Sequence, residues 1–151
     1  MISKKTKYAL NSLIYLAKNY GRGPVFIHDL ARKEGMPKKF LEAILLELKN
    51  KGFLQSRRGK AGGYLLGKSP EKIILGEVIR VLEGPLAPVS CVSQTAYQKC
   101  DECKDENCCG IRFLMKDVRD AIANILDNTN LSDVLKRIES IKENNNVTYE
   151  I

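Results

Sequence analysis

All five cysteines of the chain lie within residues 91–109, and their spacing is typical of metal ligands. Cys91, Cys100, Cys103, Cys108 and Cys109 are separated by eight, two, four and no residues. Thiolates are soft ligands for zinc and for the iron of iron–sulfur clusters, and a loop lets several of them reach one centre. The polar, acidic segment 101–107 argues against cysteines that merely fill a core. The pattern predicts a soft-metal or redox-active site, with free thiols as the alternative.

Composition indicates a globular protein. Of the 151 residues, 44% are apolar, enough to bury a core, yet no apolar run is long enough to cross a bilayer. The N-terminus lacks the pattern of a signal peptide. An odd number of cysteines suits thiolate ligands in the reducing cytosol better than a secreted disulfide framework. We therefore expect a cytoplasmic protein without a membrane partner.

Positive charge gathers in the first half of the chain. Residues 1–68 contain fifteen Lys and Arg against four acidic residues, a formal charge of +11, whereas residues 69–151 contain ten against fourteen, a charge of −4. Such asymmetry favours a polyanionic partner for the first half. Membrane headgroups are the alternative, but no exposed apolar helix accompanies the charge.

Helical periodicity predicts a helix-turn-helix in this basic half. A first helix is expected over 3–20 and a short second helix over 29–34; Gly35 then breaks the chain, and Pro37 suits the first turn of a third helix. The third helix is expected to bury Phe40, Leu41, Ile44, Leu45 and Leu48 and to expose Lys38, Lys39, Glu42, Ala43 and Lys49. This order is that of a helix-turn-helix, with an ordinary helical hairpin as the alternative.

A basic, glycine-rich hairpin is expected next. Segments 53–56 and 64–66 have the character of short strands, and Arg57, Arg58 and Lys60 lie among glycines between them. Glycine lets the backbone approach a phosphate, and arginine can enter a narrow minor groove. Such a tip alone is often a solvated turn, but directly after a helix-turn-helix it is interpreted as a wing.

The second half is predicted to be helical on either side of the cysteines. A helix over 74–82 ends at Gly84-Pro85. Beyond Cys109, apolar residues recur at near-heptad steps, which favours a long helix that pairs with a second copy over one that only packs on its own domain. They are Ile111, Leu114, Met115, Val118, Ala121, Ile122, Ile125 and Leu126. A break and cap at 130–132 precede a short helix to about residue 143, and 144–151 are expected to be flexible.

Ordered motifs over about residues 1–135 resemble the IscR/NsrR/CymR family of bacterial winged-helix regulators, also called the Rrf-two family. The motifs are Tyr8-Ala9-Leu10, Phe40-Leu41-Glu42, Glu47-Leu48-Lys49, Ser56-Arg57-Arg58-Gly59, Gly62-Gly63-Tyr64-Leu65-Leu66, Leu75-Gly76-Glu77-Val78-Ile79 and Leu82-Glu83-Gly84-Pro85-Leu86. The resemblance implies a mainly α fold with a small β-hairpin wing, in which a winged helix-turn-helix is followed by a long C-terminal dimerisation helix. We expect a DNA-binding domain (1–84), a cysteine-rich loop (85–110), a dimerisation and C-terminal helical unit (111–143) and a flexible tail (144–151).

The resemblance also implies a homodimer on a pseudo-palindromic double-stranded DNA operator, with the third helix in the major groove and the wing in the minor groove. Glu42 matches a family position that helps to discriminate bases, and Arg58 matches the wing arginine. The predicted DNA-binding residues are Lys38, Lys39, Glu42, Arg57, Arg58 and Lys60. Lys60-Ala61 departs from the common Gly-Pro-Gly-Gly-Gly wing and leaves the operator sequence open.

In cluster-binding members of this family three cysteines are ligands, and the last precedes the dimerisation helix. Cys109 matches that junction, so Cys91, Cys103 and Cys109 are the expected ligands of a 2Fe-2S or 4Fe-4S cluster. The fourth ligand is expected to be Cys100 or Cys108.

Two cations stand at family ligand positions. Arg112 takes the place of a histidine in IscR-like members, and Lys7 that of an aspartate which NsrR-like members offer from the partner subunit; neither cation is a normal ligand. Zinc in a four-cysteine site is one alternative to a cluster. Metal-free thiol sensing is another, with docking on a metabolic enzyme in the manner of CymR-like proteins.

No catalytic constellation stands out. His28 is the only histidine, and neither a Ser/His/Asp set nor a carboxylate pair accompanies it. The chain is therefore predicted to be a transcriptional regulator, of the repressor type, and not an enzyme.

Overall fold

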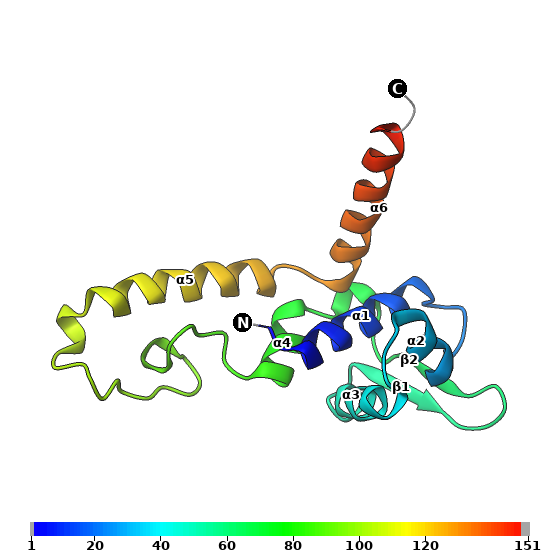
Figure 1. Ribbon diagram of the computed structural model, residues 1–151, viewed down its shortest axis with the longest axis horizontal. Helices are drawn as coiled ribbons and strands as arrows, with labels where there is room; N and C mark the ends of the chain where they lie inside the picture. Colours follow the sequence, from blue (N-terminus) through cyan, green and yellow to red (C-terminus); the bar gives the residue numbers. More distant parts are fainter. Residues whose placement is uncertain (1, 149–151) are drawn as a thin grey trace.

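The computed structural model describes residues 2–148 as a compact head from which a long helical arm extends (Figure 1). The helices and strands are α1 (Lys4–Lys18), α2 (Ile27–Glu34), α3 (Lys38–Asn50), β1 (Leu54–Arg57), β2 (Gly63–Leu66), α4 (Leu75–Glu83), α5 (Gly110–Asp127) and α6 (Leu131–Thr148). Short 3-10 turns lie at η1 (Pro70–Lys72), η2 (Ser90–Val92) and η3 (Glu106–Cys108). The expected mainly α fold with a small antiparallel hairpin is confirmed. No helix of this described part is long and apolar enough to cross a bilayer.

The head is organised around aliphatic side chains that α1, α2, α3, α4, the start of α6 and the hairpin bury together. Ser3 begins α1, because its hydroxyl accepts a hydrogen bond from the Thr6 N–H. Burial of each large aliphatic side chain contributes roughly 1.5–3 kcal/mol. The fully buried members are Leu13, Leu30, Leu41, Ile44, Leu45, Leu48, Ile73, Val78 and Leu131.

α2 and α3 form the predicted helix-turn-helix. Gly35 ends α2 in the left-handed conformation (φ 63°, ψ 34°), which glycine adopts without a steric penalty. One expected core residue differs: Phe40 is 40% exposed, and its ring packs edge-on against Tyr8, with centroids 5.7 Å apart. Helical spacing places Phe40 at the border of the buried face, where only one side of the ring is covered.

The wing is a two-stranded hairpin held against the head. Leu54 lies opposite Leu66, and both are buried. Val25, in the loop between α1 and α2, exchanges two backbone hydrogen bonds of 2.8 Å with Tyr64. The wing is therefore tied to the core at its base, through Leu54 and Leu66, and to the loop before the helix-turn-helix through Tyr64.

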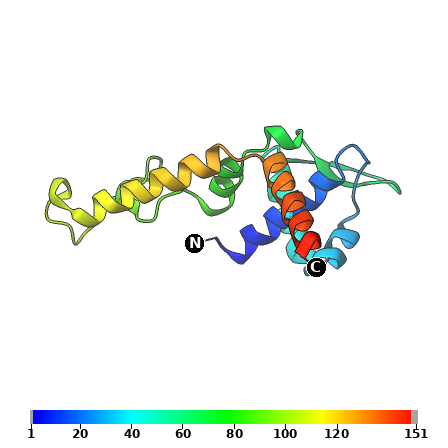
Figure 2. The same ribbon diagram turned by 90° about the horizontal axis from the view of Figure 1, so that it is seen from above.

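The arm consists of α5 and the connection 84–109, which extends away from the head beside α5 and returns to its N-terminus (Figures 1 and 2). No residue of α5 is buried. The cysteine-bearing end of the arm is thus far from the head, while the C-terminal end of α5 meets α4.

α6 is longer than predicted and starts inside the head. Asn130 and Asp133 cap it reciprocally, each side chain accepting the other residue's N–H at 2.9 and 3.0 Å. Leu131 is fully buried, so α6 begins in the core of the head. The sequence had indicated one unit of α6 and the dimerisation helix. The helix runs to Thr148 and not only to about residue 143, while residues 149–151 lie outside the described part; the expected flexibility of 144–151 stays a prediction.

Candidate functional site

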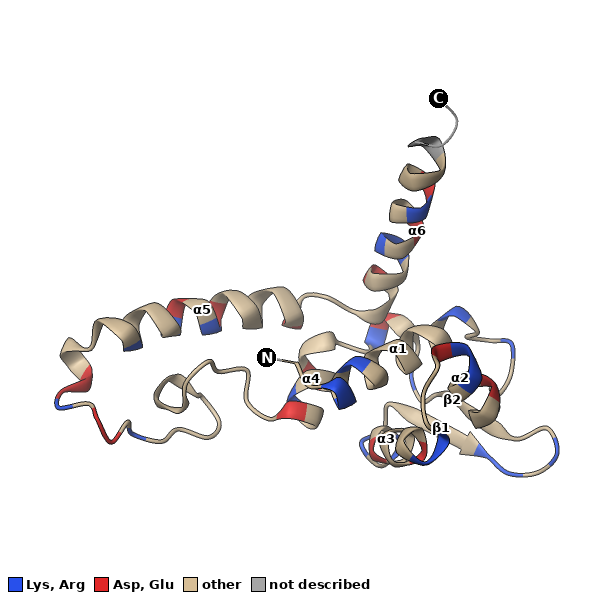
Figure 3. Ribbon diagram, in the orientation of Figure 1, with Lys and Arg blue, Asp and Glu red and all other residues tan. Residues whose placement is uncertain are grey.

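The outer face of α3 carries the side chains predicted to contact DNA. Lys38, Lys39, Glu42 and Lys49 are all exposed, as the sequence indicated. Lys38 lies 3.9 Å from Glu42 across one helical turn, so the carboxylate already has a weak cationic neighbour. Lysine and arginine residues lie along α1, α2, α3 and the wing (Figure 3).

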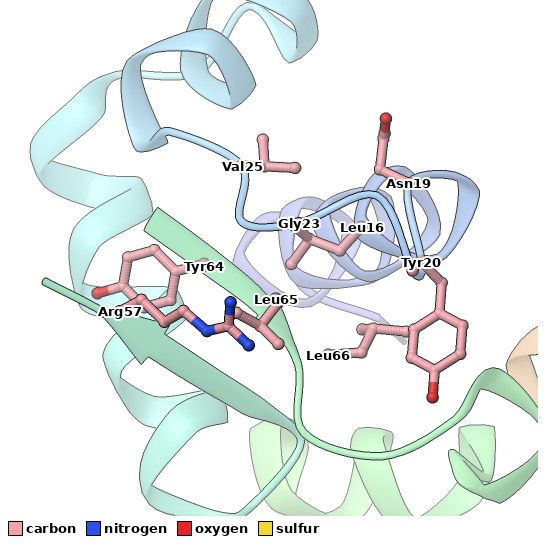
Figure 4. Close-up of a pocket in the computed structure, with 10 residues that line it drawn as sticks. Leu16, Asn19, Tyr20, Gly23, Val25, Arg57, Tyr64, Leu65 and Leu66 are labelled. Carbon is pink, nitrogen blue, oxygen red and sulfur yellow. The ribbon is translucent and has the colours of Figure 1, made fainter. Parts of the chain in front are cut away.

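The three cations of the predicted wing tip occupy two different places. Arg57 ends β1 and lines a cavity of about 320 Å³ between the hairpin strands and the end of α1, with Tyr20, Tyr64 and Leu65 (Figure 4). Arg58 and Lys60 lie beyond the strands on the exposed tip. The tip cations can therefore reach furthest from the head, whereas Arg57 lies in the last strand pair before the tip, opposite Gly63.

All five cysteines line one cavity of about 710 Å³ at the N-terminal end of α5, and we call it the cysteine cavity. Cys91 is buried, Cys100, Cys103 and Cys109 are half-buried, and Cys108 is exposed. The wall also includes Glu102, Lys104, Asp105, Glu106, Ile111 and Arg112. The structure thus brings together residues that lie up to eighteen positions apart in the chain.

Within this cavity three thiols interact. Burial raises the pKa of the Cys103 thiol, and hydrogen bonding to Cys109 and the nearby Cys100 raise it further. The Cys108 thiol instead hydrogen-bonds the Asp105 carboxylate. The pKa of Asp105 is lowered mainly by the hydrogen bond from the Asn107 N–H and then by that from Cys108. Cys100 and Cys109 therefore both act on Cys103, whereas Cys108, on the same cavity wall, is exposed and acts on Asp105.

Two polar contacts hold the loop in shape. Tyr97 donates its hydroxyl proton to Glu106 Oε1 at 2.5 Å, which raises the pKa of Tyr97. Arg119 of α5 donates to the backbone oxygen of Val92, next to Cys91, and its side chain is only 13% exposed. Because Arg119 also pairs with Asp120, it fixes the buried cysteine segment to a defined turn of α5.

The donor set fits a soft metal centre, although the thiols do not surround a common point. Among residues 2–148, no three Cys, His, Asp or Glu side chains are arranged to hold a metal ion. Thiolates are nevertheless the ligands that zinc and iron–sulfur clusters share, and five of them line one cavity. A Cβ at Gly110 would meet open space, so this junction between loop and helix is uncrowded. A metal would require the loop to draw its thiols closer together.

α4 connects the arm to the head. Arg80 forms a two-pronged ion pair with Asp127 of α5, at 2.6 and 2.8 Å. The hydrogen bonds lower the pKa of Asp127 and raise that of Arg80. A Cβ at Gly76 would lie 2.0 Å from Asp127 Oδ1, so a side chain there would displace the carboxylate.

The other end of α4 reaches the first helix. Glu83 Oε1 accepts the Ser3 N–H at 2.6 Å, and hydrogen bonds from Ser3 and Thr6 lower the pKa of Glu83 to about 2. One turn into α1, Lys5 pairs with Glu47 of α3 at 2.6 Å. Polar contacts thus link the cysteine loop, α5, α4, α1 and α3 in succession.

α5 presents an apolar face that its own chain leaves uncovered. Between 37% and 70% of each large side chain on it is exposed. These residues are Ile111, Leu114, Val118, Ile122 and Ile125. Next to them lies a cavity of about 490 Å³ lined by Ile2, Ile79, Leu86 and Leu126 among others. An apolar surface of this kind is expected to be covered by another chain.

A family model described as an iron-dependent transcriptional regulator, Rrf2, matches residues 2–137. The chain belongs to the Rrf2 family. An rrf2-like HTH-type transcriptional regulator of Rhodobacter capsulatus is 41% identical over 138 residues, covering 89% of this chain and 92% of the relative. The HTH-type transcriptional regulator CymR of Bacillus subtilis is 35% identical over 142 residues, 94% of each chain.

Solved structures agree with this membership of the Rrf2 family. CymR of B. subtilis, described as a global cysteine regulator, superposes with a TM-score of 0.77 and 36% identity, covering 91% of this chain and 97% of that one. IscR of T. potens superposes with a TM-score of 0.73 and 30% identity, covering 93% of this chain and 90% of that one. The predicted winged-helix fold and family are confirmed, and the Rrf2-family chain is a DNA-binding transcriptional regulator and not an enzyme.

Sequence reasoning missed the side chains that position the site in this Rrf2-family chain. Arg80 and Asp127 are 47 residues apart, and no local pattern indicates that they pair. For Arg119 a signal was present: Arg112, Lys116 and Arg119 recur at helical spacing, which places three cations on one face of α5. That face lines a cavity of about 250 Å³ together with Cys91.

Proposed function

We propose that the chain is a homodimeric repressor whose affinity for a pseudo-palindromic DNA operator is controlled by an iron–sulfur cluster. The observation that carries this proposal is the cysteine cavity, in which five thiols lie at the start of the helix with the uncovered apolar face. Zinc is the alternative metal, since it uses the same ligands.

Cys91, Cys103 and Cys109 are the proposed core ligands. Cys100 is the better candidate for the fourth, because its thiol lies near Cys103 inside the cavity, whereas Cys108 is exposed and hydrogen-bonds Asp105. When bound, the cluster would supply a redox-active or labile centre that responds to the state of the cell.

On the DNA side, the exposed face of α3 is proposed to enter the major groove. Lys38 and Lys39 would contact phosphates, and Glu42 would accept a hydrogen bond from a cytosine amino group. Arg58 and Lys60 would reach the minor groove from the wing tip, and Arg57 would contact the backbone from the end of β1 next to the tip.

The apolar face of α5 is proposed to pair with the same face of a second copy, which sets the distance between the two reading heads. The cysteine loop is attached to α5 through Arg119, and α5 to α4 through Arg80 and Asp127. A change in the loop would thus move the heads relative to each other. If this path carries the signal, Arg80→Gln should reduce the ratio between metal-bound and metal-free operator affinity; an unchanged ratio would exclude it.

Metal-free thiol sensing in the manner of a CymR-like regulator is the second candidate. The likeness to CymR in sequence and structure favours it, as does the contact between the Cys103 and Cys109 thiols. The two candidates differ in one measurable property, since the second requires no bound metal.

The deciding experiment is anaerobic purification and reconstitution with iron and sulfide, followed by iron, sulfide and zinc analysis and an absorption spectrum. Matched iron and sulfide with visible charge-transfer bands would support the cluster, and stoichiometric zinc the alternative metal. Cys103→Ser should abolish binding, Cys100→Ser should weaken it, and Cys108→Ser is the matched control. Reconstituted protein without iron or zinc would exclude both metals and leave the thiol-sensing candidate.

A further inference from the structure

Arg112 is a half-buried cation that has one buried nitrogen without a hydrogen-bond partner. It lies one turn into α5, three residues after Cys109, and lines the cysteine cavity. It also lines the neighbouring smaller cavity with Cys91, Tyr97 and Lys116. Its Nε is buried and makes no hydrogen bond within the described part of the chain. A buried donor left unpaired is destabilising, so its persistence calls for a ligand.

Acidic residues near Arg112 do not satisfy it. Glu106, on the same cavity wall, accepts a hydrogen bond from Tyr97, and Asp105 accepts from Asn107 and Cys108. Arg119, two turns further along α5, is by contrast fully engaged with Val92 and Asp120. Among the ion pairs of residues 2–148 none involves Arg112. The Nε–H of Arg112 is therefore available to a group that enters the cavity.

The charge of the cysteine cavity indicates which kind of group would pair with Arg112. Residues 99–109 contain four carboxylates and two lysines, a formal charge of −2 before any thiol ionises. Metal binding deprotonates the thiols and adds further negative charge. Lys104 lines the same cavity but is exposed, so water screens its charge. Arginine keeps its proton and offers several N–H donors, which makes it a counter-charge and not a ligand.

We propose that Arg112 is the counter-charge of the thiolate-bound centre, and that its N–H groups donate to the ligating sulfurs. This inference rests on the proposed function and assigns a role to a residue that does not ligate. Hydrogen bonds to sulfur and nearby positive charge favour the more negative, reduced form of a thiolate centre. Arg112 thereby raises the reduction potential for uptake of one electron from an external reductant, and it strengthens metal retention.

The test compares wild type, Arg112→Gln, Arg112→Lys and Lys116→Gln after anaerobic reconstitution with iron and sulfide. Lys116 is the matched control, because it lies one turn along the same face but does not line the cysteine cavity. Iron and sulfide content, circular dichroism and the midpoint potential from a dithionite titration are measured on each sample. Wild-type iron and sulfide content alone decides the proposed function.

With the cluster present, Arg112→Gln should shift the midpoint to a more negative value, Arg112→Lys should restore part of the shift, and Lys116→Gln should stay near wild type. Loss of the cluster in folded Arg112→Gln but not in Arg112→Lys would also support the counter-charge. Equal midpoints at full occupancy, or loss of the cluster in both variants, would overturn it, because lysine retains the charge. If wild type holds zinc instead, zinc affinity is measured by competition with a chromophoric chelator in place of the midpoint potential. An unchanged zinc affinity in Arg112→Gln would then overturn the proposal.

Discussion

The head buries its apolar side chains within one chain, whereas the arm leaves its own exposed. Leu13, Leu41 and Leu48 in the head are fully buried, while Ile111 and Ile125 in α5 are 70% and 65% exposed. A fold with a closed core is stable by itself, but an amphipathic helix with a bare face is not complete without a partner.

The two regions also differ in their polar groups. In the head, Lys5 pairs with Glu47, and Ser3 caps α1. In the arm, Arg112 Nε is buried without a partner and five thiols face one cavity. The difference indicates that the reading head is preformed, while the arm is the part whose state can change through a second chain and a bound centre.

The largest effect is expected from a charge on the bare face of α5. Ile122→Glu would place a carboxylate in the proposed interface, where burial without a partner is costly. Size-exclusion chromatography with light scattering should show a monomer. Operator affinity should fall on the order of 100-fold, because a monomer binds one half-site without the second subunit being held close to the other half-site.

The matched control for Ile122→Glu is Ser140→Glu, which adds the same charge at an exposed site on α6. A fully dimeric Ile122→Glu protein would show that this face is not the contact between copies.

A cavity in the head should cost stability where the same truncation in the arm does not. Leu131→Ala removes a fully buried side chain at the start of α6 and should lower the free energy of unfolding by about 2–5 kcal/mol. Ile125→Ala, at a side chain that is 65% exposed, should cost less than about 1 kcal/mol in the isolated chain. Urea denaturation of both variants measures the contrast, and equal losses would contradict it.

Removal of one wing cation should weaken DNA binding more than removal of a cation elsewhere. Arg58→Ala is expected to reduce operator affinity by about tenfold and the salt slope by about one. Arg137→Ala, in α6, serves as the control. Fluorescence anisotropy at several salt concentrations gives both quantities, and wild-type values for Arg58→Ala would remove it from the interface.

The smallest effect is a pH dependence at the junction of α4 and α1. Because its hydrogen bonds lower the pKa of Glu83 to about 2, ionised Glu83 stabilises the folded state at pH values above its ordinary pKa. This contribution is lost as the pH falls from the ordinary value towards 2. Thermal unfolding should therefore separate wild type from Glu83→Gln near neutral pH and bring them together in acid; a constant gap would refute the assignment.

The sequence predicted the elements that follow local rules. Periodicity located α1, α3 and α5, and Gly35 marked the turn of the helix-turn-helix. It misjudged Phe40, because spacing indicates a face but not how much a neighbour covers it. It ended α6 too early, because the polar run after Glu143 looks unfavourable in isolation, whereas the helix continues through it.

The site was predictable in its residue types but not in its contacts. Cysteine spacing predicted the soft-metal donors, yet only the three-dimensional path of the loop shows that Cys100 and Cys109 act on Cys103 whereas Cys108 acts on Asp105. The pairing of Arg80 with Asp127 depends on tertiary packing between α4 and α5, which no local pattern encodes.

The most direct test of the account measures operator affinity and metal content on the same anaerobic sample, before and after the metal is removed by chelation. Wild type should hold a stoichiometric centre, and its operator affinity should fall when the centre is removed, while Cys103→Ser should behave as metal-free protein throughout. Equal affinity of the metal-bound and metal-free wild type, at confirmed metal content, would contradict the claim that the cysteine cavity controls DNA binding.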